Sequence, residues 1–101
     1  MLYEQIKEIL SIREKLHPED DYGIQKCWDE LIELLSKNED NTIECLCLCT
    51  YNEVDWLSEV FEDIAYNLQS RRYIECLKKL DVKYPELNLN RCILTAEDYL
   101  E

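Results

Sequence analysis

The stretch TYNEVDWLSEVFEDIAYNL, residues 50–68, decides the fold, because it combines a clear helix start with an unbroken helical pattern. Thr50 is followed three residues later by Glu53, and the two side chains can each satisfy a free backbone amide as a capping box. Apolar residues then recur at helical spacing, namely Val54, Leu57, Phe61, Ile64 and Leu68. The sequence therefore predicts one helix over residues 50–68.

The side of this predicted helix that lies away from the apolar stripe is acidic and aromatic. It carries Asp55, Glu59, Glu62, Asp63 and Tyr66, with Trp56 at its border. Exposed carboxylates steer basic partners, and tryptophan and tyrosine are enriched among the residues that dominate interface energies. We therefore predict that these six residues bind a partner protein. The alternative is that Trp56 and Tyr66 pack against neighbouring helices and leave a solvated acidic face.

Helical patterns extend on both sides of this stretch. The chain has one glycine and two prolines, which leaves few tight turns and disfavours a sheet built from hairpins. The expected helices cover residues 2–16, 24–37, 42–49 and 71–84, and Asn90 is expected to cap a last one. Residues 42–49 also alternate as a strand would, but no partner strand is visible elsewhere.

Four side chains have expected places in these helices. Arg13 interrupts an apolar stripe, so we expect its stem to cover the rim of the core and its charge to lie in water. Trp28 is expected in the core, and Ser70 is expected to cap the helix that follows it. Tyr99 is expected on the buried side of the last helix, together with Cys92 and Ala96.

Short helices joined by short turns predict an all-α fold. Residues 1–101 are expected to form a single compact domain of five to six antiparallel helices, because a chain of this length can bury one core but not two. Either a compact bundle or a small array of stacked helical hairpins fits the pattern, and no internal repeat favours the array.

The charge of the chain is strongly negative and concentrated in its middle. Residues 28–70 hold eleven carboxylates and one lysine, which accounts for most of the net charge of −12. Such a field repels nucleic acid and anionic membranes and attracts basic proteins. The first residues lack the layout of a signal peptide and no run is apolar enough to span a membrane, so we expect a cytoplasmic protein.

No catalytic residue, cofactor or metal site is expected. The only histidine, His17, precedes Pro18 in a predicted turn, and no serine or cysteine is placed beside it. On a helix, Cys45 and Cys49 share a face but Cys47 points away, so this segment cannot supply three ligands to one zinc ion. The six cysteines are expected to be reduced and buried, packing as small hydrophobic residues.

The C-terminal half contains four segments with a characteristic helical sequence pattern: WLSEVFEDI (residues 56–64), YIECLKKL (73–80), KYP (83–85) and AEDY (96–99). Together they resemble small helical immunity proteins of bacterial toxin systems, including those of contact-dependent inhibition. The resemblance implies a cytosolic, non-enzymatic antidote that binds a cognate toxin domain, often a nuclease, and covers its active site or substrate groove. The cysteine-rich residues 45–49 depart from that pattern.

Charge and resemblance lead separately to the same hypothesis. Nucleases are basic where they grip phosphates, so an acidic protein surface can occupy that groove in place of the nucleic acid. The hypothesis is an immunity protein that binds a basic nuclease toxin. The alternative is an acidic adaptor or nucleic-acid mimic that regulates a DNA-binding protein. A thiol- or metal-dependent enzyme is a third possibility that no constellation of residues supports.

Overall fold

A computed structural model describes residues 1–101 and shows helices and no strand. Its α-helices are α1 (Leu2–Lys15), α2 (Asp21–Leu35), α3 (Glu39–Leu48), α4 (Tyr51–Leu57), α5 (Phe61–Leu68), α6 (Arg71–Lys83) and α7 (Asn90–Asp98). Two short 3-10 turns, Ser58–Val60 and Pro85–Leu87, precede α5 and α7. The prediction of an all-α fold is therefore confirmed, and the segment that could also have been a strand is helical.

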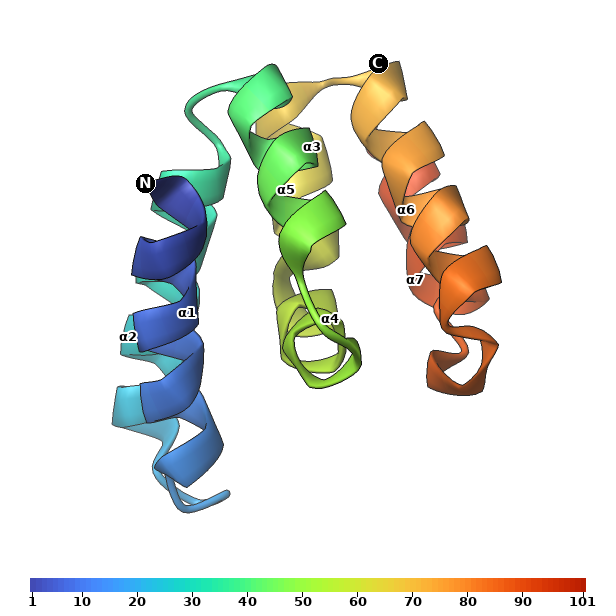
Figure 1. Ribbon diagram of the computed structural model, residues 1–101. Helices are drawn as coiled ribbons and strands as arrows, with labels where there is room; N and C mark the ends of the chain where they lie inside the picture. The colour runs from blue at the N-terminus through green and yellow to red at the C-terminus, as the bar shows by residue number, and fades with distance from the viewer.

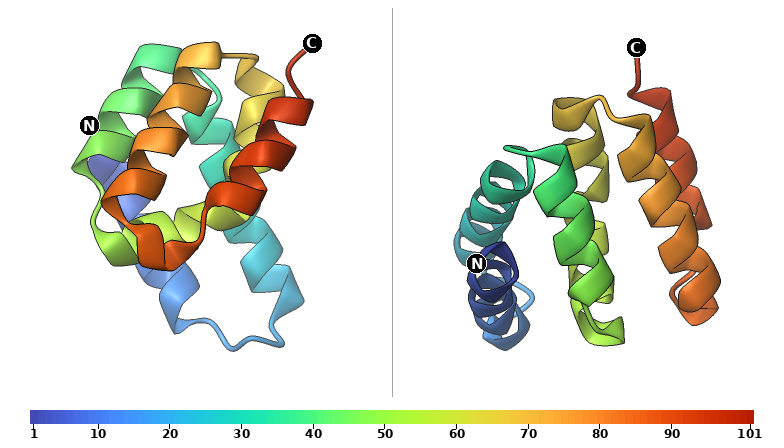
Figure 2. Two further views of the ribbon diagram at one scale, coloured as in Figure 1. Left: turned by 90° about the vertical axis from the view of Figure 1, so that its right-hand side faces the viewer. Right: turned by 45° about the horizontal axis from the view of Figure 1, so that its top comes forward.

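The helices form three hairpins that stand side by side in two layers (Figure 1). In one layer α3 lies between α1 and α6, and in the other α5 lies between α2 and α7. Helix α4 lies crosswise at one end, where the chain passes from the first layer to the second (Figure 2, left). The sequence left a bundle and a hairpin array open, and the structure is a hairpin array.

All three hairpins contribute to one core of 23 buried residues. Buried polar side chains in and beside this core are satisfied, because Tyr73 donates its hydroxyl to the carbonyl of Phe61 at 2.9 Å and Thr42 donates to the carbonyl of Leu35 at 2.6 Å. A single shared core makes the chain one domain. None of the helices combines the length and the apolar character that a membrane crossing requires.

Two helices begin earlier than their apolar patterns indicate, because a side chain caps each of them. Asp20 accepts a hydrogen bond from the amide of Gly23 at 3.0 Å, so α2 starts at Asp21. This cap leaves little room at Gly23, where a Cβ atom would lie 2.8 Å from an oxygen of Asp20. Asn38 caps α3 in the same way through the amide of Asn41, at 2.9 Å.

The predicted caps of the later helices have different outcomes. Ser70 caps α6 by accepting from the amide of Tyr73 at 3.0 Å, as predicted. The predicted cap at Asn90 is wrong, because Asn90 is already the first residue of α7 and Leu89 precedes it without a capping side chain.

Candidate protein-binding surface

Helix α4 starts at the predicted capping box, and α1 reinforces it. Thr50 accepts from the amide of Glu53 at 3.4 Å, while Glu53 accepts from the amide of Thr50 at 2.9 Å. Tyr3 of α1 donates its hydroxyl to the same Glu53 oxygen at 2.8 Å. This carboxylate raises the pKa of Tyr3 to about 12, because ionised tyrosine would lose the hydrogen bond and face a second negative charge. The start of α4 is thus tied to α1.

The helix then stops at Ser58–Val60, so the prediction of one continuous helix over residues 50–68 is wrong. The hydroxyl of Ser58 donates to the carbonyl of Asp55 at 2.6 Å, and Val60 leaves the helical region with φ −119° and ψ 5°. Val60 is buried by this turn. Neither glycine nor proline marks the interruption, which is stabilised by packing against other hairpins.

The break distributes the six predicted contact residues over α4, the turn and α5. Trp56 and Glu59 lie at the junction of the turn with the first hairpin, where Arg13 contacts both. Glu62, Asp63 and Tyr66 lie on α5, and Asp55 is exposed on α4. The six residues therefore do not form one straight stripe.

Arg13 and Glu59 form the best-defined ion pair of the molecule. The guanidinium donates to both carboxylate oxygens, from Nε at 3.0 Å and from Nη2 at 2.9 Å. The side chains of Arg13 and Glu59 are 11% and 28% exposed, respectively. Bidentate geometry of this kind gives the strongest arginine–carboxylate contacts. Glu59 therefore links α1 to the turn before α5, and its charge is compensated within the fold.

Both tryptophans surround this ion pair. The indole nitrogen of Trp28 donates to Glu59 at 3.2 Å, and the guanidinium carbon of Arg13 lies 4.6 Å from the ring centre of Trp56. Both rings are half-buried. The expected placement of Arg13, with its charge in water, is therefore wrong, because a carboxylate and an aromatic face replace the water. Trp28 lies at the edge of the core, where its N–H reaches a partner.

The other three predicted carboxylates have no cationic partner. Asp55, Glu62 and Asp63 take part in none of the ion pairs of the structure. Glu62 is half-buried beside α7, where its charge adds to burial in raising the pKa of Cys92 to about 11. Asp55 and Asp63 are exposed. These uncompensated charges make α4 and α5 a source of negative potential.

An exposed pair of tyrosines lies where the last turn of α5 meets the end of α7. Tyr66 is 58% exposed and Tyr99 is 41% exposed, and their rings meet edge to face with centres 6.2 Å apart. Gln69 holds the pair by donating to the backbone carbonyls of both, at 2.9 and 2.8 Å. The expected burial of Tyr99 is therefore wrong. It is a surface residue that the sequence reasoning missed, because its helical spacing from Ala96 indicated the core.

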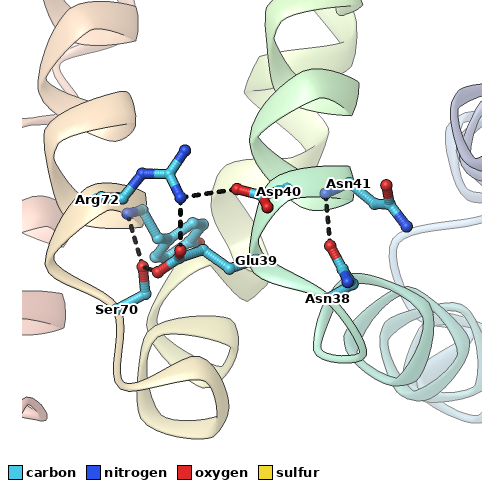
Figure 3. A network of polar contacts seen from close by, with 7 residues as sticks. Asn38, Glu39, Asp40, Asn41, Ser70 and Arg72 are labelled. Carbon is cyan, nitrogen blue, oxygen red and sulfur yellow. Dashed lines mark hydrogen bonds and ion pairs between the residues drawn. The ribbon is translucent and has the colours of Figure 1, made fainter.

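Other acidic residues differ in whether they have an ion-pair partner within the protein. Glu39 and Asp40 both accept from Arg72, at 2.8 and 2.7 Å, and Glu39 also accepts from the hydroxyl of Ser70 (Figure 3). Glu33 is exposed on α2 and takes part in no ion pair. The carboxylates at the start of α3 are therefore compensated within the fold, whereas that of Glu33 on α2 is not.

The cysteines form no disulfide, and four of the six are buried. Cys49 donates its thiol to the carbonyl of Cys45 at 3.3 Å, which places both in the core. Cys47 is exposed, contrary to the expectation that all six are buried. His17 is exposed in a turn and accepts from the amide of Glu19 at 3.1 Å. No three histidine, cysteine or acidic side chains are grouped as a metal site would need.

Comparison with protein-family models, with curated proteins and with solved structures finds no match to this chain.

Proposed function

We propose that this protein is an immunity protein that binds a cognate bacterial toxin domain, a basic nuclease, and covers its substrate groove. One observation carries the proposal: α4 and α5 carry the carboxylates of Asp55, Glu62 and Asp63 without ion-pair partners, and the last turn of α5 carries the exposed Tyr66, which packs against Tyr99. Charges without internal partners are available to a basic surface, and exposed tyrosines supply contact area at low entropic cost. The resemblance of the C-terminal half to immunity proteins supports the same function.

Neutralisation would proceed by competition with nucleic acid. The negative field of residues 28–70 would speed encounter with a basic groove, as electrostatic steering does in other complexes. Carboxylates of α4 and α5 would then pair with cations that otherwise hold phosphates. The tyrosine pair would pack on the rim of the groove and slow dissociation, because most affinity differences between related complexes lie in the dissociation rate.

The six predicted residues have different roles in this proposal. Asp55, Glu62, Asp63 and Tyr66 contact the toxin. Trp56 and Glu59 act by position, because their contacts with Arg13 orient the turn from which α5 starts. Their substitution would alter protection through the fold and would not reveal a direct contact.

Co-expression with the toxin domain encoded beside this gene tests the proposal. The native protein should restore growth and co-purify with the toxin. Changing Asp55 and Asp63 to lysine should leave the helices intact, because both side chains are exposed, and should slow association about tenfold at low salt. The slowing should shrink as salt rises, since exposed charges are screened over about 8 Å at physiological ionic strength.

A matched control changes Glu8 and Glu14 to lysine, which makes the same charge difference on exposed positions of α1. Equal protection by both double variants would contradict the proposed contact surface. If the neighbouring gene encodes no toxic domain and the chain co-purifies with a DNA-binding protein, the regulatory alternative replaces the immunity function.

A further inference from the structure

A groove between α3 and α6, in the layer that does not contain α5, is lined mainly by basic and apolar residues. It has a volume of about 400 Å³, with Ile43 and Cys47 on one wall and Leu80 on the other. Arg72, Lys79 and Lys83 follow one another along its α6 wall, and Glu75 is the only acidic residue among those that line it. These three cations repeat at helical spacing and therefore face the same side of α6.

One end of this groove is closed by a polar clasp. Arg72 donates to Glu39 and to Asp40 at the start of α3, and Ser70 donates to Glu39 (Figure 3). The clasp joins the first residues of α3 to the first residues of α6. It bridges the two helices at that end and compensates the charge of Arg72.

Toward the other end the cations are free. Lys79 and Lys83 take part in none of the ion pairs, whereas the neighbouring Lys78 pairs with Glu97 at 3.5 Å and with Glu75, which lines the groove, at 3.8 Å. Lys83 has one aromatic contact, with its nitrogen 5.2 Å from the ring centre of Tyr84. Lys79 and Lys83 thus bring two uncompensated positive charges to an apolar groove in a chain of net charge −12.

We propose that the α3–α6 groove binds an amphipathic helix of a partner protein, with an apolar stripe and acidic flanking residues. The apolar stripe would rest on Ile43, Cys47 and Leu80, and the acidic residues would face Lys79 and Lys83. An amphipathic helix laid into a groove is recognised by this combination of apolar anchors and flanking charges. The net charge of −12 repels such a segment over most of the surface, and Lys79 and Lys83 offset that repulsion beside the apolar residues of this groove.

This surface goes beyond the proposed immunity function and does not depend on it. The groove lies on the layer of α3 and α6, and the carboxylates proposed to meet a toxin lie on α4 and α5. The two proposals can therefore be tested separately. Substitutions at Lys79 and Lys83 test the groove, and substitutions at Asp55 and Asp63 test the surface proposed to bind a toxin.

The test uses two synthetic helices that differ only in the sign of charge. Each is an amphipathic peptide of about four turns with one leucine stripe, and its remaining positions are glutamate in the first and lysine in the second. Titrated into the isotope-labelled full chain, the glutamate peptide should bind saturably and shift the NMR signals of Ile43, Cys47 and Leu80. The lysine peptide should leave these three signals in place.

Variants assign the binding to the groove. The double variant Lys79→Glu and Lys83→Glu should bind the glutamate peptide at least about tenfold more weakly than the native protein. The double variant Lys7→Glu and Lys15→Glu makes an equal charge change on α1 and should lower the affinity less than about twofold. Cys47→Glu, at an exposed position, should also weaken binding of the glutamate peptide. It replaces the lysine variant in this test if that variant proves unstable. Absence of saturable binding, shifts outside the groove, equal losses in both lysine variants, or groove binding by the lysine peptide would each overturn the proposal.

Discussion

Arginine cross-links two pairs of hairpins in this protein, and the two links differ in their surroundings. On the α1 side, Arg13 holds Glu59 with two hydrogen bonds and lies against the ring of Trp56. On the α6 side, Arg72 bridges Glu39 and Asp40, with the side chains of Arg72 and Asp40 65% and 72% exposed. The first link is sheltered by neighbouring side chains and the second is open to water.

The shelter around each ion pair decides how much that pair contributes to the stability of the fold. A sheltered ion pair is costly to break, because the remaining partner keeps its charge with little water to solvate it. An exposed pair exchanges protein contacts for water at little cost. We infer that the α1 side fixes the geometry of the α4–α5 break, while the ion pairs on the α6 side contribute little to the packing of α3 against α6.

The largest expected effect follows from removing the sheltered arginine. Arg13→Ala should lower the free energy of unfolding by about 2–3 kcal/mol, somewhat less than a fully buried pair, because Glu59 keeps some solvent and its bond from Trp28. In a domain of this size the melting midpoint should fall by about 10–20 °C. Thermal melts monitored by circular dichroism measure this fall.

Arg13→Lys is the matched control for this prediction. It keeps the positive charge but cannot present two parallel donors to Glu59, so it should recover less than half of the loss. A midpoint for Arg13→Ala close to that of the native protein would show that the sheltered pair contributes no more than a surface one.

Much of the helical framework could be predicted because its signals are local. The capping box at Thr50 and the cap at Ser70 depend on residues three apart in sequence, and both are present. The apolar stripes likewise identified the buried side of α5, where Phe61 and Ile64 are fully buried. Such signals need no knowledge of which hairpin lies beside which.

The candidate surface was less predictable because tertiary contacts decide it. Nothing near Ser58 indicates a break, since the turn is held in place by burial of Val60 and by Arg13, which is 46 residues from Glu59 in sequence. The exposure of Tyr99 depends on its packing against Tyr66 in a neighbouring hairpin. Sequence patterns identify a side chain's own helical face and do not identify the element that covers it.

A second contact of the α1 side gives an intermediate and pH-dependent effect. Tyr3 donates to Glu53, which raises the pKa of Tyr3 from 10.0 to about 12 in the folded state. Because the folded state holds this proton more tightly, the stabilisation is complete below pH 10 and is lost as the pH rises toward 12. Tyr3→Phe should lower the melting midpoint by about 5 °C at neutral pH.

Comparing the native protein with Tyr3→Phe isolates this contribution from other groups that titrate in alkali. Urea unfolding at several values between pH 8 and pH 11.5 should show the two curves converging as the pH rises. A constant difference over that range would mean that the hydroxyl of Tyr3 stabilises the fold without titrating.

The smallest effect is expected at the exposed link, and salt distinguishes it from the sheltered one. Arg72→Ala removes two ion pairs, but all three side chains keep contact with water and Glu39 keeps the hydroxyl of Ser70. The melting midpoint should therefore fall by at most about 3 °C. Raising the salt from about 0.05 M to 1 M should abolish this small difference, since screening then acts within about 3 Å, but should leave most of the Arg13→Ala loss. If both losses shrink in proportion, Arg13 and Glu59 are solvated like surface charges, and the orientation of α5 must depend on the burial of Val60 alone.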